Sequence, residues 1–417
     1  MANTVSMNRP FDMNFATERA YAASSATSEL TGLGHAVYLD YNATTPCDPR
    51  VVEAMLPYFT EVFGNAANGL HPQGRRAARA VAIGREQVAE LMGAQPNEIT
   101  FTAGATESNN LAIFGLARRG TIGSISTRHR IVTSAVEHKA VLAPCERLRD
   151  EGYGLEVLPV DDQGRVDLAA AAAIIDEHTL LVSVQAANNE TGVIQPIAEL
   201  ANLAHAQGSI FHCDAAQVLG KIPIDVNAVG IDLLSASAHK LYGPKGIGVL
   251  YVRKSSPTLK LQPLILGGGQ ESGLRSGTTN VPAIVGFGEA CRIIFAEGAD
   301  ERIRIERLRN QFEQGLLAAV DSLLVQSSKV LRLPNTSSLT FPGTDADALL
   351  LNLPKVMMGT GSACSSGAIE PSHVLQAMGV SRTDAFSTVR ATLGRFTTAD
   401  EITIAIRAIV GAWQELQ

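Results

Sequence analysis

Two kinds of hydrophobic pattern alternate along most of the chain. Short runs rich in apolar and β-branched residues predict β-strands, and they lie at 36–40, 98–104, 130–136, 155–160, 179–185, 209–214, 232–237 and 248–253. Between most of them lie longer segments with apolar residues at helical spacing, for example at 50–63, 73–93 and 104–119. Strands that alternate with helices in this way predict an α/β fold with a mainly parallel sheet.

The pattern changes near residue 285. The segment 285–320 has the periodicity of one long helix and is heavily charged in its middle. A strand at 337–341, a helix at 345–353 and a final helix at 398–416 follow. We therefore expect the long helix to connect the large sheet domain to a smaller C-terminal α/β domain.

The composition is that of a globular enzyme with a substantial core. Hydrophobic residues make up 46% of the 417 residues and charged residues 18%, with a net charge of −7. Direct binding of nucleic acid would need a clustered basic face, which the sequence lacks, so we do not expect it. The longest aliphatic run, at 168–175, is far shorter than the roughly 20 residues of a membrane span, so we expect no membrane segment.

The N-terminus and the cysteines indicate a cellular compartment. Residues 1–34 lack the apolar centre of a signal peptide, and we expect them to form a disordered N-terminal extension. The five cysteines are scattered, without a CxxC pair or the His/Cys spacing of a metal site. We therefore expect no bound metal, a reducing compartment and a cytoplasmic location.

One cysteine has unusual neighbours. Cys364 lies in the stretch GTGSACSSGAIEPS at 359–372, where glycines and serines offer little apolar surface to bury a thiol. A cysteine on such an accessible loop is either incidental or a reactive nucleophile. The residues around Cys364 do not decide between these two interpretations.

Two charged residues at predicted strand ends suggest a cofactor. Lys240, within SASAHKLYGPKG, suits a Schiff-base lysine as well as a surface lysine beside a turn. Asp214 ends the strand at 209–214, where a carboxylate is either a helix N-cap or the partner of a cation. A lysine for the aldehyde and an aspartate for the pyridine nitrogen are the usual protein contribution to pyridoxal phosphate chemistry. Together, Lys240 and Asp214 predict pyridoxal 5'-phosphate as cofactor.

Further polar residues follow other predicted strands. GATES at 104–108 opens a helix, so its backbone N–H groups and the Thr106 hydroxyl could hold a phosphate. His138 either lies over an aromatic ring or caps the next helix, and Asn189 either donates to a ring oxygen or satisfies a buried turn. Polar residues at five strand ends predict a ligand site at the carboxyl edge of the sheet.

Nine segments together resemble the cysteine desulfurases, pyridoxal-phosphate enzymes of the class V aminotransferase group. They are LDYNATTP (39–46), GATESNNLA (104–112), EHKAVL (137–142), NNETGV (188–193), HCDAAQ (212–217), SAHKLYGPKGIG (237–248), GLRSGTTN (273–280), GSACSS (361–366) and VRATLGR (389–395). The resemblance extends from about residue 36 to the end of the sequence. It implies the aspartate aminotransferase fold (PLP fold type I), with a large, mainly parallel seven-stranded sheet domain at 50–295. A smaller C-terminal α/β domain, formed by 35–49 and 296–417, would carry the cysteine loop.

The resemblance also implies roles for residues around the cofactor. Lys240 would carry it as a Schiff base, Asp214 would pair with the pyridine nitrogen, and His138 would stack on the ring. The contacts to the phenolic oxygen and the phosphate would come from Ala105, Thr106, Asn189, Gln217, Ser237 and His239. Thr278 would reach the phosphate bound by the partner subunit, which implies a homodimer.

The implied reaction converts L-cysteine into L-alanine. Arg390 and Asn189 would bind the substrate carboxylate, because the planar guanidinium offers two parallel hydrogen bonds. Cys364 would attack the substrate sulfur and hold it as a persulfide, with Lys240 and His138 as the other catalytic residues. The spacing from GSAC to EPSHVL resembles the long-loop, iron–sulfur-assembly type, whose cysteine delivers sulfur to an acceptor protein. The acceptor would serve iron–sulfur cluster assembly or the thio-modification of tRNA or DNA.

Three alternatives remain open at this point. A class V aminotransferase would share Lys240, Asp214 and Arg390 but would not need Cys364. A selenocysteine lyase would share all four residues. A binding or scaffold protein with an idle fold would not hold the cofactor on Lys240.

Overall fold

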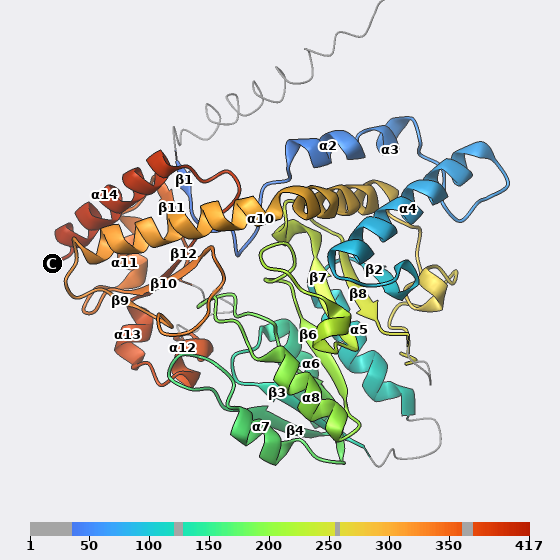
Figure 1. Cartoon of the computed structure of the whole chain (residues 1–417), viewed down its shortest axis with the longest axis horizontal. Helices are drawn as coiled ribbons and strands as arrows, with labels where there is room; N and C mark the ends of the chain where they lie inside the picture. The colour runs from blue at the N-terminus through green and yellow to red at the C-terminus, as the bar shows by residue number, and fades with distance from the viewer. Residues whose placement is uncertain (1–35, 121–127, 255–258, 361–369) are drawn as a thin grey trace, which may run out of the picture.

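One long helix, α10 (Val281–Leu317), runs through both parts of the molecule (Figure 1). The computed structural model describes residues 36–120, 128–254, 259–360 and 370–417. A large sheet lies beside the first half of α10, and a smaller group of strands and helices lies beside its second half (Figure 1). The extension predicted at 1–34 and Cys364 lie outside the described residues.

The large sheet has the strand order β2-β8-β7-β6-β5-β3-β4. Its seven strands are β2 (Ile99–Thr102), β3 (Arg130–Ser134), β4 (Gly154–Leu158), β5 (Thr179–Ser183), β6 (Ile210–Asp214), β7 (Leu233–Ser237) and β8 (Gly248–Val252). β8 is antiparallel to both of its neighbours, whereas the pairs from β7 to β4 are parallel. The predicted α/β fold with a mainly parallel sheet is therefore confirmed, and the carboxyl ends of all its strands except β8 meet at one edge.

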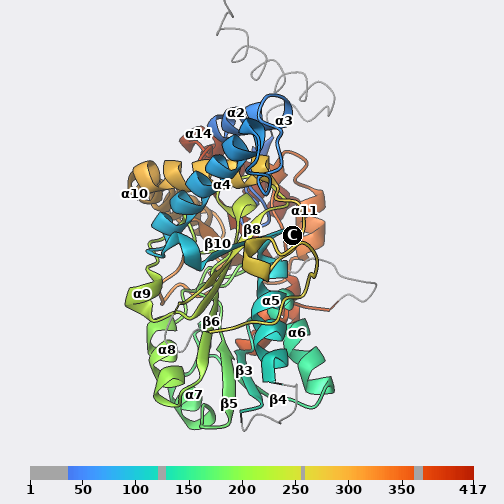
Figure 2. The same cartoon turned by 90° about the vertical axis from the view of Figure 1, so that its right-hand side faces the viewer.

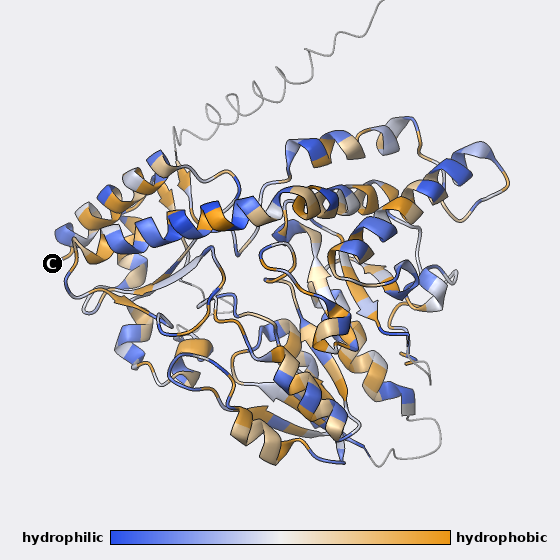
Figure 3. Cartoon of the chain, in the orientation of Figure 1, coloured by the Kyte–Doolittle hydropathy of each residue, from blue (hydrophilic) through white to orange (hydrophobic). Residues whose placement is uncertain are grey.

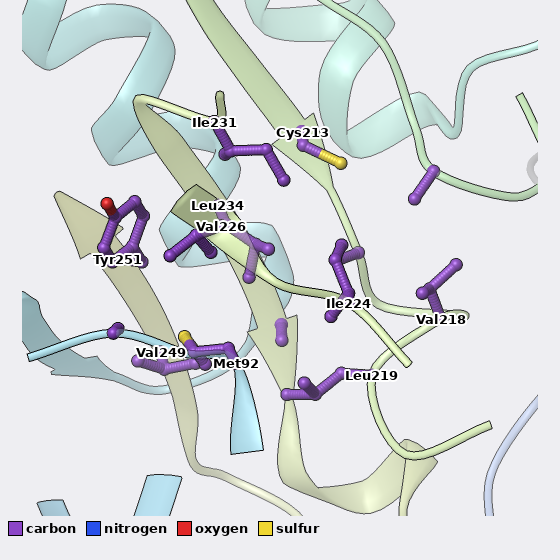
Figure 4. Close-up of a cluster of buried hydrophobic side chains, with 14 of the residues drawn as sticks. Met92, Cys213, Val218, Leu219, Ile224, Val226, Ile231, Leu234, Val249 and Tyr251 are labelled. Carbon is purple, nitrogen blue, oxygen red and sulfur yellow. The ribbon is translucent and has the colours of Figure 1, made fainter. Parts of the chain in front are cut away.

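Neighbouring residues of a strand point to opposite faces of the sheet, so the apolar residues of these strands lie on both faces, and helices cover both. In β7, for example, Leu233 and Leu234 belong to two different buried clusters. One cluster includes α5 (Ala105–Ala117) and α6 (Lys139–Asp150), and the other includes α4 (Pro72–Leu91), α7 (Leu168–Ile174), α8 (Ile197–Ala206) and α9 (Val226–Val229), as Figure 2 shows from the side. In the second cluster, Leu234 and Val249 of the sheet lie near Met92 and Val226 (Figure 4).

The segment predicted as one helix at 50–63 forms two short helices instead. They are α2 (Pro49–Met55) and α3 (Pro57–Thr60). Pro57 has no amide hydrogen with which to continue α2, so the prediction of an unbroken helix was wrong. Three short 3₁₀ turns adjoin other elements, namely η1 (Pro96–Glu98), η2 (Arg118–Gly120) and η3 (Ala238–Lys240), whereas η4 (Glu271–Gly273) lies in the loop between β8 and α10.

The smaller part combines two short sheets with helices. Strand β1 (Val37–Tyr38) pairs in parallel with β11 (Val356–Met357). The antiparallel strands are β12 (Thr388–Thr392), β10 (Thr336–Thr340) and β9 (Leu324–Val325), in that order. The helices are α11 (Ala346–Leu351), α12 (His373–Ala377), α13 (Arg382–Phe386) and α14 (Ala399–Glu415). The strand predicted at 337–341 and the helices predicted at 345–353 and 398–416 are present as β10, α11 and α14.

Helix α10 contributes to both hydrophobic cores. Ala283 and Phe287 pack with the large sheet, whereas Ile305, Phe312 and Leu316 pack with the smaller part. Its 37 residues extend over roughly 55 Å. Polar residues divide its apolar ones (Figure 3), and no helix among the described residues is long and apolar enough to cross a membrane.

Candidate active site

A cavity of about 690 Å³ opens at the carboxyl edge of the large sheet. Nine residues predicted to bind the cofactor line it, namely Ala105, Thr106, His138, Asn189, Asp214, Gln217, Ser237, His239 and Lys240. Arg390 and Thr278 lie outside this lining, and Cys364 lies outside the described residues. The strand ends thus bring together residues that are up to 135 positions apart in the sequence, because parallel strands end at a common edge.

Lys240 lies at the end of the η3 turn that directly follows β7. Its Nζ donates to the carbonyl of Ala43 at 2.8 Å and also to the carbonyl of Asn42. Burial, reinforced by the charge on Arg390 and opposed by the charges on Asp214 and Asp40, lowers the pKa of Lys240 to about 8. About one tenth of the amine is therefore neutral at pH 7, which makes it a nucleophile at neutral pH.

Asp214 is the last residue of β6 and is only 6% exposed. One carboxylate oxygen accepts from the backbone N–H of Ala216 at 2.9 Å, and the other accepts from Asn109 Nδ2 at 2.7 Å. The first contact is the local capping bond that the sequence left open, but the carboxylate also lines the cavity. Both donors are uncharged, so this buried anion can accept a further, cationic donor from the cavity.

His138 is the N-cap of α6, one of the two positions considered for it, and it also lines the cavity. As the N-cap of α6, its Nδ1 accepts from the backbone N–H of Ala140 at 3.1 Å. Its ring also lines the cavity, and burial lowers its pKa, which Asp214 opposes and Lys240 reinforces. The imidazole ring of His138 therefore forms part of the cavity wall, is largely uncharged at neutral pH and is held in place by its hydrogen bond to Ala140.

The opposite end of the cavity is built from backbone at the start of α5. Ser108 is the first residue whose N–H pairs within this helix, with the carbonyl of Gly104 at 3.0 Å. The N–H groups of Ala103 and Gly104 bond side chains, which leaves those of Ala105, Thr106 and Glu107 for an anion. Gly248 allows this turn to lie close to the sheet, since a Cβ there would be 2.5 Å from Gly104 Cα. Ser237, at 3% exposure, borders the same turn.

His239 adds a neutral hydrogen-bonding ring beside this turn. Its Nδ1 lies 3.1 Å from Thr44 Oγ1. Burial lowers the pKa of His239 to about 4, and the nearby charges of Lys240, Lys245 and Lys221 contribute. At neutral pH the ring can therefore give or accept a hydrogen bond but carries no charge.

Arg390 reaches the site from β12 of the smaller part and is 7% exposed. Its guanidinium donates to Asp40 Oδ1 at 2.7 Å and to the backbone carbonyl of Asn189 at 3.1 Å. Its Nε is buried without a hydrogen-bond partner among the described residues. The structure thus places Arg390 beside Asn189, as expected, with one donor still unsatisfied.

Three important residues were not singled out from the sequence. Asn109 holds Asp214, Asn42 accepts from Lys240, and Lys221 donates to Asn42 Oδ1 at 2.7 Å. The first two lie within the GATESNNLA and LDYNATTP motifs, which could have indicated them. Lys221 had only one signal, its position four residues after Gln217.

The chain is similar to proteins of known sequence and structure over most of its length. A curated relative from Anaeromyxobacter sp., named "Cysteine desulfurase IscS", is 47% identical over 91% of this chain and 93% of the relative. The solved NifS-like protein from Rickettsia africae is 34% identical with a TM-score of 0.80, over 91% of this chain and 100% of that one. A structure titled "SspA in complex with cysteine" is 37% identical with a TM-score of 0.76, over 87% and 100% of the two chains. The family model described as Aminotransferase class-V matches residues 37–404, and the chain therefore belongs to the class V aminotransferase family.

Proposed function

We propose that this protein is a pyridoxal-phosphate-dependent cysteine desulfurase that converts L-cysteine into L-alanine and retains the sulfur as a persulfide on Cys364. The observation that carries the proposal is the cavity itself. Lys240, the buried carboxylate of Asp214 and the free N–H groups of α5 all face it. A relative with 47% identity bears the name of this activity.

The residues of the cavity fit pyridoxal phosphate on three counts. The amine of Lys240 can bind an aldehyde, because its lowered pKa leaves part of it neutral. Asp214 has only uncharged partners and suits a protonated pyridine nitrogen. The start of α5, with Thr106, Ser237 and His239 around it, suits a phosphate. When bound, pyridoxal phosphate supplies the electron sink that activates an amino-acid substrate.

The remaining contacts are assigned on the same basis. Ala105 would donate its backbone N–H to the phosphate, and His138 would lie against one face of the ring. Gln217 and Asn189 would direct their side chains to the phenolic oxygen. Arg390 would bind the substrate carboxylate, using the Nε donor that has no partner among the described residues.

Cys364 is the thiol best suited to act as nucleophile. The described cysteines are Cys47, Cys145, Cys213 and Cys291, and burial raises the pKa of each thiol. A raised pKa reduces the thiolate fraction on which nucleophilic attack depends. Cys364 has almost no apolar neighbours in sequence, so its sequence context gives no reason to expect a buried thiol.

We also propose a homodimer. Apolar side chains are exposed on α3 and the loop after it, with Phe59 60%, Phe63 69% and Leu70 94% exposed. A second copy of the chain would cover such surface. Thr278 is exposed and lies outside the lining of the cavity of its own chain, which suits a contact to the cofactor of the partner subunit. Sedimentation should therefore give about twice the mass of one chain, and a fully active monomer would contradict this.

The domain limits and the biological setting complete the proposal. We assign 50–295 to the large cofactor-binding domain, and 35–49 with 296–417 to the small domain. The change of core along α10, between Ile294 and Ile305, supports this domain boundary.

Persulfide sulfur would pass to an acceptor protein in the cytoplasm, for iron–sulfur cluster assembly or thio-modification.

Two experiments test the activity. Borohydride reduction of the loaded protein, followed by peptide mapping, should place the cofactor on Lys240, and label on Lys245 would overturn the assignment. Cys364→Ser should keep the visible absorbance and substrate binding but lose release of alanine and sulfide from cysteine by several hundredfold or more, on the order of a lost nucleophile. Near-normal release would favour an aminotransferase. Release of selenide from selenocysteine by Cys364→Ser would instead favour a selenocysteine lyase.

A further inference from the structure

A second lysine, Lys221, lies behind the cavity and has no part in the chemistry proposed so far. It lies on the segment after β6, four residues beyond Gln217. Its Nζ donates to Gln217 Oε1 at 2.6 Å and to Asn42 Oδ1 at 2.7 Å. Both acceptors are neutral amides, so the hydrogen bonds of Lys221 orient other side chains.

The contact to Gln217 determines how that amide is oriented. Gln217 is 7% exposed and lines the cavity. An amide has an acceptor end and a donor end, and a lysine can only donate, so Lys221 requires Oε1 on its own side. The other end, Nε2, carries two hydrogens, of which one bonds the carbonyl of Asn42 at 3.0 Å. One N–H of Gln217 therefore remains for a group in the cavity.

The contact to Asn42 extends the same network to Lys240. Asn42 Oδ1 accepts from Lys221 and from Asn335 Nδ2 at 3.0 Å. Its backbone carbonyl accepts from both Gln217 and Lys240. One connected set of hydrogen bonds thus joins Lys221, Gln217, Asn42 and Lys240, with the carbonyl of Asn42 as the acceptor that Gln217 and Lys240 share.

Charged groups from several elements lie near Lys221. Burial lowers its pKa well below the ordinary value, and the positive charges of Lys240 and Arg390 act in the same direction. Glu301 and Arg302 of α10 line a cavity of about 20 Å³ that Lys221 and Lys240 share. The charged amine has no lone pair and can only donate, whereas the neutral amine still has the two hydrogens that its two acceptors need but no longer excludes the opposite orientation of Gln217.

We propose that Lys221 is a positioning residue that fixes the side-chain amide of Gln217 with an N–H directed into the cavity, toward the phenolic oxygen of the cofactor. The inference rests on the proposed function, because it takes Gln217 as a contact of pyridoxal phosphate. Without Lys221, only the bond from Nε2 to the Asn42 carbonyl would hold the amide in this orientation, so its oxygen would turn to the cavity more often, where a negatively charged oxygen would repel it.

The test is a double-mutant cycle on the loaded protein, read by its visible absorbance as a function of pH and by the dissociation constant of pyridoxal phosphate. A donor aimed at an anionic oxygen favours the deprotonated form, so Gln217→Ala should raise the apparent pKa of the absorbance change. A rise of about one unit is expected, because losing a hydrogen bond to a charged group shifts an equilibrium about tenfold or more. Lys221→Met should produce a shift of the same sign, and Lys221→Arg should restore most of the wild-type value.

The combination of variants separates positioning from other effects. If Lys221 acts through Gln217, adding Lys221→Met to Gln217→Ala changes nothing further. Fully additive shifts, or a shift for Gln217→Ala with none for Lys221→Met, would overturn the inference. Lys329→Met, which removes an exposed lysine, is the matched control and should leave the titration unchanged. If the methionine variant does not fold, Lys221→Gln, whose amide can either donate to Gln217 or accept from it, should give a shift of the same sign and of at most the same size.

The same data distinguish this inference from the proposed function. A wild-type protein that binds no pyridoxal phosphate would contradict the proposed function itself. A wild-type protein that binds it, with Gln217→Ala shifted and Lys221→Met unshifted, would contradict only the role of Lys221.

Discussion

The amine of Lys240 should be far more reactive at neutral pH than an ordinary lysine. Burial and the neighbouring Arg390 lower its pKa from 10.5 to about 8. At pH 7 the neutral, reactive fraction is then roughly 300-fold larger than it would be at the ordinary value. Because the aldehyde of the cofactor reacts with a neutral amine, this shift prepares Lys240 for that reaction.

Competitive acetylation of the apoprotein measures this directly. Trace acetic anhydride is added between pH 6 and 11, and the labelling of Lys240 relative to the exposed Lys329 is followed by peptide mass spectrometry. Restricted access slows the reaction at every pH, so the midpoint carries the information. We expect it near pH 8. Arg390→Met should move it upward and Asp214→Asn downward, because the two charges act in opposite directions.

The lowered pKa of Lys240 also makes the free energy of unfolding depend on pH, in a known direction. The folded protein holds Lys240 at a lower pKa than the unfolded chain, so protonation disfavours the fold, and stability rises between about pH 8 and 10.5. Below pH 8 the cost is at most about 3 kcal/mol, since each pKa unit corresponds to about 1.4 kcal/mol. Lys240→Met should therefore stabilise the apoprotein against urea at pH 7, with a smaller gain above pH 10. An acetylation midpoint near 10.5, or a destabilised methionine variant at pH 7, would refute the reasoning.

Three further substitutions probe the rest of the cavity. Gly248→Ala should destabilise the protein by about 1–3 kcal/mol and weaken phosphate binding, because its Cβ would meet the backbone of Gly104. The control Gly411→Ala, whose Cβ would lie in open space, should do neither. Thermal unfolding measures the stability and dialysis of the cofactor measures the binding, and equal effects of the two variants would contradict the clash. Arg390→Lys should raise KM for cysteine about tenfold or more with a smaller change in kcat, because a lysine lacks the bidentate fork; an unchanged KM in sulfide-release assays would remove Arg390 from substrate binding. Asn109→Leu should weaken retention of pyridoxal phosphate about tenfold or more, since Asp214 loses its side-chain donor; equal retention in equilibrium dialysis would show that this bond is dispensable.

Local sequence patterns were sufficient for the sheet and for much of the cavity. The alternation that separates Leu233 from Leu234 is visible in any single strand, and polar residues at parallel strand ends must share an edge. The break at Pro57 also has a local cause, the missing amide hydrogen of proline, but the apolar periodicity continues across Pro57 and does not reveal it.

The contacts across the two parts could not be predicted from such patterns. Arg390 bonds Asp40 over 350 positions, and Gln217 bonds Asn42 over 175. A polar residue in a motif shows no preference for one distant partner over another, since its partner is chosen by tertiary packing. For this reason the sequence indicated which side chains face the cavity but not which neighbours orient them.

The segment from Asp40 to Ala43 explains how residues from both parts keep a fixed separation. Asp40 holds the guanidinium of Arg390, and the carbonyl of Ala43 accepts from Lys240. Three peptide units separate these anchors, so their backbone atoms lie at most about 11 Å apart. Arg390, which we propose binds the substrate carboxylate, and Lys240 are therefore both bonded to one short stretch of chain, itself paired with β12 through Asp40 and Thr392. The proposed substrate, an α-amino acid, is short enough to reach both groups, because this stretch of chain limits how far apart its two anchors can lie.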